Sequence, residues 1–301
     1  MTLLIGIAAV LIFMVVCIMC TGSPEPEEPT RMVSLGKRLD NGKHLRFRFD
    51  LGTHLLFAGI TGFGKSNQIN LVLSQLATSD DVQFLVANAK GGTDFMAWLP
   101  RASIVAIGPD ATDKMVNEAL TILRDRYKML IPEGDIDTEE GMAALMAAER
   151  KIVITPYMPL VLVVIDEFVE YLKGGSSNQR AHKLHSLATL GRAVGVTLLI
   201  AAQRPSQWSA PTDIRENIPY HISFRLDKYG TEMLFGRGTM SDVPLNKLEI
   251  PGHGYAIVPG ELSPVPFIAP EVTTELCASL AWQTARLRQK TSLKHLIQDA
   301  A

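Results

Sequence analysis

The sequence has few cysteines and no excess of positive charge. Its 301 residues include three cysteines, Cys17, Cys20 and Cys277, whose spacing matches no metal-ligand pattern and suggests no disulfide pair across the fold. This cysteine usage favours a reducing compartment. The formal net charge of -2 excludes a uniformly basic protein, so any contact with nucleic acid must come from local loops, multiplied by oligomerisation.

The N-terminus lacks basic residues, since no Lys or Arg precedes Arg31, and a secretory signal needs a positive region. Residues 3–20 are an unbroken apolar run with one glycine, at the lower edge of the length that spans a bilayer. The first positive charges follow this run, so we expect a single-pass anchor over residues 1–22 in the inner (cytoplasmic) membrane, with the body in the cytoplasm. A buried hydrophobic helix is the alternative, but residues 23–29 are acidic and proline-bearing, as in a solvated linker.

From Arg31 onward, apolar runs alternate with amphipathic segments, which predicts an α/β fold with a mostly parallel sheet and helices on both faces. Helical periodicity predicts a helix over residues 111–130 and a terminal helical segment over 273–288. The expected core strands are 55–58, 83–87, 103–107, 160–165 and 196–202, and shorter strands are expected at 221–226, 254–258 and 265–269.

The most informative motif is a phosphate loop directly after an apolar strand. Residues 59–66 read Gly-Ile-Thr-Gly-Phe-Gly-Lys-Ser, the pattern whose backbone N–H groups cradle the phosphates of a nucleoside triphosphate. Lys65 is expected to bridge the β- and γ-phosphates and Ser66 to ligate Mg²⁺. A merely glycine-rich turn is the alternative. The expected nucleotide-binding residues are Gly59, Thr61, Gly62, Phe63, Gly64, Lys65, Ser66 and Asn67.

A second motif is the apolar strand 160–165, which ends in Asp166 and Glu167. After a phosphate loop, this pair is typical of a Walker B element. Asp166 would then hold Mg²⁺ through water, and Glu167 would orient or deprotonate the attacking water. An Asp-Glu pair after a strand is also common as a helix N-cap followed by a first-turn acid, so the upstream loop is what favours catalysis.

A third segment contains two further candidates, Arg192 and Gln203. A helix ends at Gly191-Arg192, turns through Gly195 and leads into a core strand that stops before Gln203. A glutamine there senses the γ-phosphate in NTPases whose sheet has an extra strand between the two Walker strands. Arg192 is placed to reach a neighbouring subunit's nucleotide. Its alternative role is a helix C-terminal charge, which contributes less than about 1 kcal/mol.

With these motifs, residues 54–260 resemble the FtsK/SpoIIIE family of DNA-translocating ATPases, in the FtsK–HerA branch of P-loop motors. The resemblance implies a RecA-like fold, ATP and Mg²⁺ as cofactors, and a hexameric ring around double-stranded DNA. It also implies Arg192 as a trans-acting arginine finger and Gln203 as the sensor. Beyond the phosphate loop, the shared motifs are Ala-Lys-Gly-Gly (89–92), Ile-Asp-Glu-Phe (165–168), Gly-Arg-Ala-Val-Gly (191–195), Ala-Ala-Gln-Arg-Pro (201–205), Asn-Ile-Pro (217–219) and Phe-Gly-Arg-Gly-Thr-Met (235–240).

The chain departs from that family at two places. Phe63 stands where the family usually has a small residue, and only about forty residues follow Gly260, so we expect no winged-helix module. A short chain with a nearby anchor is similar to TraB-like conjugation proteins. The expected parts are a transmembrane anchor (1–22), a linker with a first strand (23–50), an FtsK-like motor domain (51–270) and a C-terminal helical segment (271–301).

The resemblance predicts a membrane-anchored, ATP-dependent translocase of double-stranded DNA, acting in conjugative transfer, chromosome partition or mobile-element maintenance. A type VII-like protein-secretion ATPase and a viral genome-packaging ATPase are the alternatives. Trp98 and Trp208 are expected in core or rim packing. The candidate DNA contacts, each equally compatible with a solvated surface charge, are Arg215, Lys228, Arg237 and Lys247.

Overall fold

The computed structural model describes residues 31–131, 150–173, 176–203, 212–235, 243–291 and 295. All of these belong to one compact unit that begins at Arg31. The anchor predicted over residues 1–22 lies outside the described residues, as does the first part of the linker. Within the described ranges, no helix combines the length and the apolar character needed to cross a bilayer.

A ten-stranded mixed sheet forms the centre of this unit, in the order β2-β1-β10-β9-β8-β3-β7-β6-β4-β5. Strands β8 through β5 in this order run parallel, and the remaining four pair antiparallel. Every residue of β4, β6 and β7 is buried, as expected for parallel strands covered on both faces. The strands are β1 (Met32–Arg38), β2 (His44–Arg48), β3 (Leu55–Ala58), β4 (Val82–Asn88), β5 (Ile104–Ile107), β6 (Leu160–Asp166), β7 (Val196–Ala202), β8 (Tyr220–Ser223), β9 (His253–Ile257) and β10 (Val265–Ile268).

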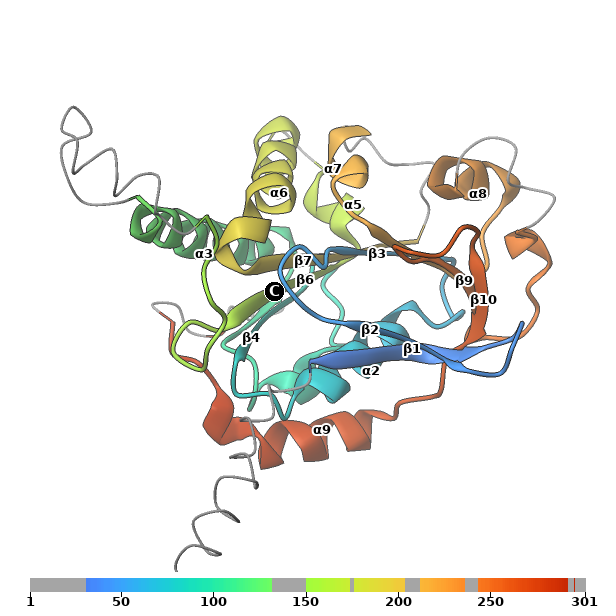
Figure 1. Ribbon diagram of the computed structural model, residues 1–301, viewed down its shortest axis with the longest axis horizontal. Coiled ribbons are helices and arrows are strands. Elements are labelled where there is room, and N and C mark those ends of the chain that lie inside the picture. Colours follow the sequence, from blue (N-terminus) through green and yellow to red (C-terminus); the bar gives the residue numbers. More distant parts are fainter. Residues whose placement is uncertain are drawn as a thin grey trace, which may run out of the picture. The chain divides into compact units, whose positions relative to one another are not determined.

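Helices cover both faces of the sheet (Figure 1). One face carries α3 (Pro109–Met129), α5 (Phe168–Tyr171), α6 (Ser177–Leu190) and α7 (Thr212–Glu216); the other carries α2 (Lys65–Leu76) and α9 (Thr274–Gln283). The remaining helix, α8 (Lys228–Phe235), follows β8.

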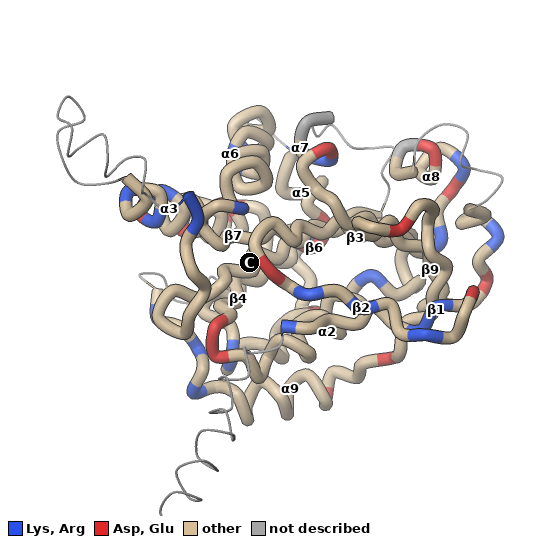
Figure 2. Tube along the Cα trace, viewed as in Figure 1, with Lys and Arg blue, Asp and Glu red and all other residues tan. Residues whose placement is uncertain are grey.

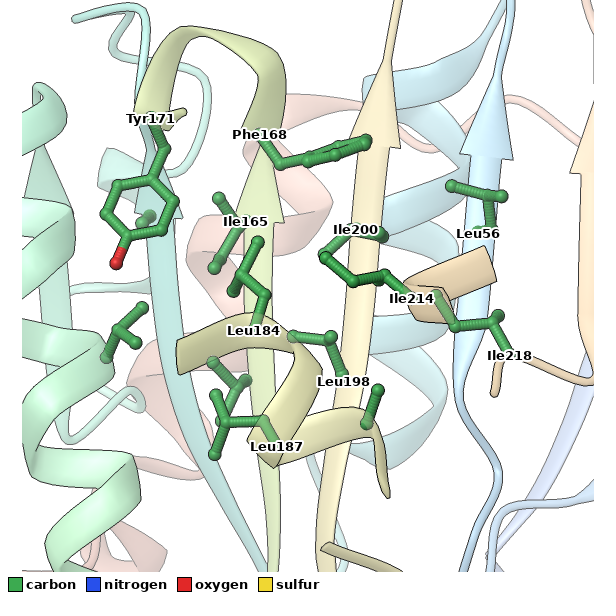
Figure 3. Packing of buried hydrophobic residues seen from close by; sticks show 14 of the residues in the cluster. Leu56, Ile165, Phe168, Tyr171, Leu184, Leu187, Leu198, Ile200, Ile214 and Ile218 are labelled. Carbon is green, nitrogen blue, oxygen red and sulfur yellow. The ribbon is translucent and has the colours of Figure 1, made fainter. Parts of the chain in front are cut away.

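Apolar packing holds α6 and α7 against the parallel strands. Leu184 and Leu187 of α6 lie over β6 and β7, and Ile214 and Ile218 lie over β7 and β3 (Figure 3). All four side chains are at most 2% exposed. Burying a side chain of this size contributes roughly 1.5–3 kcal/mol, so this face is a firm support for the loops at the strand ends.

The predicted α/β fold with a mostly parallel sheet and helices on both faces is confirmed. Strand β7 lies between β3 and β6, which is the extra strand between the Walker strands that the RecA-like expectation requires. The largest difference from the predicted strands is at β8, which was expected to extend to residue 226 but stops at Ser223; the chain then leaves the sheet to pass beside the phosphate loop.

The linker with a first strand was expected over residues 23–50; in the described part of that range, residues 32–48 form two strands of the main sheet. Strand β1 pairs with β10, so this hairpin continues the sheet of the region 51–270 that was expected as the motor domain. No local sequence pattern predicts that β1 pairs with β10, because the two strands lie more than two hundred residues apart in the sequence. Trp98 is fully buried and its indole N–H donates to Asn70 at 2.9 Å, which confirms core packing. Trp208 lies outside the described residues.

Candidate nucleotide-binding site

Four parallel strands deliver polar side chains to one edge of the sheet. β3 leads into the phosphate loop, β4 ends in Asn88, β6 ends in Asp166 and is followed by Glu167, and Gln203 follows β7. The carboxyl ends of parallel strands form the crevice in which open α/β sheets bind ligands. Here they surround a cavity of about 670 Å³, lined by Thr61, Gly62, Gly64, Lys65, Ser66, Asn67, Asn88, Lys90, Gly91, Gly92, Asp94, Asp166, Glu167 and Gln203.

The phosphate loop depends on glycine where it passes β8. Gly59 has φ 153°, and a Cβ there would lie 2.9 Å from Cβ of Phe224. Gly64, with φ 115°, precedes α2 as its N-cap. The Ile60 N–H donates to the Arg225 carbonyl at 2.9 Å. The loop is therefore held from outside by the residues after β8, and its inner side faces the cavity.

Lys65 is the first residue of α2 and joins the loop to the Walker B strand. Its ammonium donates to the Gly59 carbonyl at 2.7 Å and lies 4.0 Å from Oε1 of Glu167. Burial lowers the pKa of Lys65, although the nearby carboxylates of Glu167 and Asp166 act in the opposite direction. A nearby anion stabilises the charged form of a desolvated ammonium, and a triphosphate brings several negative charges to it.

The two carboxylates are buried next to one another. Burial raises the pKa of Asp166, and Asp94 adds to this rise. Burial and then the charge of Asp166 raise the pKa of Glu167, while Lys65 lowers it. Two neighbouring carboxylates that share one lysine favour an additional cation, because each like charge disfavours ionisation of the other.

Oxygen atoms from Ser66 and Asp166 are suited to that cation. Ser66 Oγ lies 3.5 Å from Oδ2 of Asp166, at the outer limit of a hydrogen bond. A hydroxyl and a carboxylate are the kind of oxygen ligands that Mg²⁺ takes beside nucleotide phosphates. Across the described part of the chain, no group of three or more His, Cys, Asp or Glu side chains forms a metal cluster. The residues present thus fit a magnesium ion shared with phosphates.

Glu167 has an unusual backbone and an unsatisfied side chain. Among the described residues other than glycine, it alone has a positive φ, 54° with ψ 47°. Such left-handed residues cluster at functional sites. Its carboxylate accepts from the Gln203 backbone N–H, while Oε1 is buried without a hydrogen-bond partner. The left-handed turn therefore brings a proton acceptor to the cavity beside Lys65.

Of the four predicted catalytic residues, Arg192 is the one that does not line this cavity; the predicted loop residues Gly59 and Phe63 do not line it either. It belongs to the 3₁₀ helix η2 (Gly191–Val194), which precedes β7, whereas Gln203 follows β7. The seven residues of β7 span roughly 20 Å. Gln203 lines the same cavity as Lys65, so Arg192 lies at the opposite edge of the sheet from both. Its exposed side chain passes over Gly52, before β3. Within one chain, Arg192 does not contact the nucleotide edge.

Two residues of the predicted loop make contacts away from the cavity. The Asn67 side chain donates to the Pro270 carbonyl at 2.8 Å and accepts from the Val272 N–H at 2.7 Å. The Phe63 ring faces the Arg225 guanidinium at 5.2 Å. These side chains support the loop, while Thr61 and Gly62 lie exposed at the rim of the cavity.

Sequence reasoning did not single out Asn88, Lys90 and Asp94 as site residues. Asn88 ends β4 and pairs in register with Asp166, and its side chain donates to Asp94 at 2.8 Å. The Lys90 charge lowers the pKa of both Lys65 and Glu167. The signal was present in the Ala-Lys-Gly-Gly turn at 89–92, but only the β4–β6 pairing shows that this turn borders the cavity.

The candidate DNA contacts remain predictions. Lys228 begins α8 and Lys247 ends η5 (Leu245–Lys247), and both are exposed; Arg215 in α7 is half-buried. Arg237 lies outside the described residues. Basic and acidic residues are interspersed along the described trace (Figure 2), in keeping with the small net charge.

Known proteins are similar to this chain in sequence, and others are similar to it in fold. The chain is 28% identical over 238 residues to the DNA translocase FtsK of Streptococcus agalactiae serotype V, covering 71% of this chain and 28% of that relative. It is 32% identical over 209 residues to the DNA translocase FtsK of Clostridium acetobutylicum, covering 64% and 27%. The chain thus spans less than a third of the length of these curated relatives.

Two solved structures show the same fold. The pCW3 conjugation coupling protein TcpA, in its monomer form with ATPγS, matches with a TM-score of 0.65 at 23% identity, covering 87% of this chain and 72% of that one. The cytoplasmic domain of the Thermomonospora curvata type VII secretion ATPase EccC matches with a TM-score of 0.64 at 24% identity, covering 92% and 33%.

The family profile agrees with the site geometry. The profile of the FtsK/SpoIIIE family matches residues 21–207, which include the phosphate loop, the Walker B pair, Arg192 and Gln203. More than half of the chain lies within that match. The chain belongs to the FtsK/SpoIIIE family.

Proposed function

We propose that this protein is a membrane-anchored ATPase that moves double-stranded DNA as a hexameric ring. The observation that carries the proposal is the convergence of Lys65, Ser66, Asp166, Glu167 and Gln203 on one cavity at the carboxyl edge of the parallel strands. The relatives at 28–32% identity are named DNA translocases, which supports DNA as the substrate. Conjugative transfer, chromosome partition and mobile-element maintenance are the processes that fit this activity.

In this proposal, the residues of the cavity divide the work on ATP. The backbone of the loop and the Lys65 ammonium bind and neutralise the phosphates. Ser66 and Asp166 would hold Mg²⁺, which when bound neutralises charge on the β- and γ-phosphate oxygens. Glu167 orients the attacking water and accepts its proton at the carboxylate, since its raised pKa brings it nearer to that of an effective base. Gln203 contacts the γ-phosphate from β7.

The second edge of the sheet completes the site of another subunit. Arg192 lies too far from its own phosphate loop to act there, so in a ring with head-to-tail interfaces its partner is the neighbour's nucleotide. An arginine finger supplied in trans stabilises the charge that develops on the transferred phosphoryl group. The apolar run 3–20 would hold such rings at the cytoplasmic membrane.

ATP hydrolysis by the purified full chain, measured with and without duplex DNA, tests this function. We expect duplex DNA of any sequence to stimulate turnover, with stimulation that falls as salt rises, because phosphate contacts release counterions. The Lys65→Ala variant controls for contaminating ATPases. Stimulation by a secreted polypeptide together with no response to DNA would favour a protein-secretion ATPase and would overturn the proposal.

A further inference from the structure

The side chain of Arg192 lies directly against Gly52. The arginine side chain passes so close over Gly52 that a Cβ at position 52 would lie 2.9 Å from Cγ and 3.0 Å from Cδ of Arg192. Contacts under 3.0 Å essentially never occur for a real Cβ. Gly52 also has φ 81°, a left-handed conformation that glycine adopts without strain. The aliphatic part of Arg192 thus packs against the turn that precedes β3.

His54 is buried at the end of the same turn, and its backbone N–H donates to the Gly52 carbonyl at 2.9 Å. Its ring is 2% exposed, and Nδ1 accepts the Leu198 N–H at 2.9 Å, so the ring proton must be on Nε2. Burial, and then the charge of Arg192, lowers the pKa of His54 to about 4. At neutral pH the ring beside Arg192 is therefore uncharged, and it neither repels nor neutralises the guanidinium.

The guanidinium itself has no partner within the described chain. It makes no hydrogen bond and no ion pair with any described residue, in contrast to the buried arginines of this fold. Arg126 donates to the Val194 and Pro159 carbonyls, and Arg101 donates to three carbonyls. Arg192 instead combines an aliphatic part that packs over Gly52 with a guanidinium that makes no hydrogen bond or ion pair with a described residue. A planar guanidinium held in this way is prepared for an anion from outside the subunit.

We propose that Gly52 forms a seat for Arg192 and is a positioning residue for hydrolysis in the neighbouring subunit. This inference rests on the proposed trans role of Arg192. Gly52 lies in the turn before β3, which leads to the phosphate loop, and Arg192 lies in η2 before β7, which leads to Gln203. Strands β3 and β7 are hydrogen-bonded neighbours. The arginine and the subunit's own nucleotide contacts are thus opposite ends of one two-stranded unit.

The test is the full-length Gly52→Ala variant, whose methyl group would displace the Arg192 side chain. Gly260→Ala is the matched control, because Gly260 also has a left-handed φ of 93° but no atom within 4 Å of the added Cβ. We expect both variants to bind ATPγS within about twofold of the wild type and to melt at similar temperatures. Only Gly52→Ala should lose turnover, by about a hundredfold, as for a catalytic group misplaced by 1 Å.

Mixing experiments distinguish a misdirected arginine from a damaged fold. A Lys65→Ala subunit lacks its own site but still presents Arg192, so mixing it with Gly52→Ala should restore hydrolysis as far as mixing it with Arg192→Ala does. Subunit exchange is confirmed by a fluorescence label. Wild-type turnover of Gly52→Ala alone, or recovery of the Arg192→Ala mixture without recovery of the Gly52→Ala mixture, would overturn the seat. Failure of the Arg192→Ala mixture would refute the trans role itself.

Discussion

Two charged side chains at opposite edges of the parallel sheet, Lys65 and Arg192, differ in what they contact. At the carboxyl edge, Lys65, Asp166 and Glu167 are buried and interact with one another. At the amino edge, Arg192 is exposed and its guanidinium has no partner among the described residues. In the proposed function, the charges clustered around Lys65 bind ATP within one chain. The exposed guanidinium of Arg192, by contrast, would act only when another subunit supplies the anion.

Lys65→Ala should have the largest effect and would test the carboxyl edge. The ammonium is the cation at the centre of this edge, between the Gly59 carbonyl and Glu167. Its loss leaves the phosphates without their principal counter-charge, so we expect ATP binding to be weakened beyond detection and hydrolysis to be lost. Equilibrium binding of a fluorescent ATP analogue measures this. Near-normal affinity in the variant would mean that the cavity binds nucleotide by another set of contacts.

Arg192→Ala tests the amino edge and should cost about 10³ to 10⁵ in turnover, the range known for arginine fingers. ATP affinity should change little, because the side chain lies at the opposite edge from the phosphate loop. The measurement is steady-state hydrolysis next to nucleotide binding on the same preparation. Equal losses of binding and turnover would mean that Arg192 stabilises the fold. Its role would then not differ in kind from that of a structural residue at either edge.

Glu167→Gln separates binding from chemistry within the carboxyl edge. The amide keeps the shape of the side chain but cannot accept a proton, so we expect ATP to remain bound while turnover falls by about 10² to 10⁴. In the wild type, Glu167 must be ionised to act, and its pKa is raised by burial and by Asp166. As the pH is lowered, hydrolysis should therefore begin to fall at a pH above the ordinary glutamate pKa of about 4.3. Turnover by Glu167→Gln at the wild-type rate would remove this residue from the mechanism.

His54→Gln should have the smallest effect and concerns stability at the amino edge. His54 has a pKa of about 4 in the folded chain and about 6.5 when unfolded. Its neutral ring therefore contributes fully above pH 6.5, and this contribution is lost as the pH falls toward 4, by up to about 1.4 kcal/mol per pH unit. The free energy of unfolding should fall less between pH 7 and pH 5 in His54→Gln than in the wild type. His44→Gln, at an exposed histidine of β2, controls for the loss of one imidazole; an equal fall in all three proteins would contradict the assignment.

Much of the carboxyl edge follows from local sequence. Residues 59–66 define the phosphate loop because glycine spacing and the Lys-Ser pair act within one turn, and the apolar strand before Asp166 predicts where that carboxylate lies. Asn88 and Lys90 were not recognised, because their place beside Asp166 comes from the pairing of β4 with β6. The Asn67 contacts with residues 270–272 likewise depend on the distant end of the chain.

By itself, the sequence determined the phosphate loop, the Walker B strand, the strand that ends before Gln203 and the alternation of strands and helices. These are local properties, set by backbone freedom and by the side-chain period of each segment. Tertiary structure alone decided that β1 and β2 extend the sheet and that Gly52 lies against the Arg192 side chain. Those facts depend on strand order, which is selected by packing between segments that are far apart in the chain, so no local pattern encodes them.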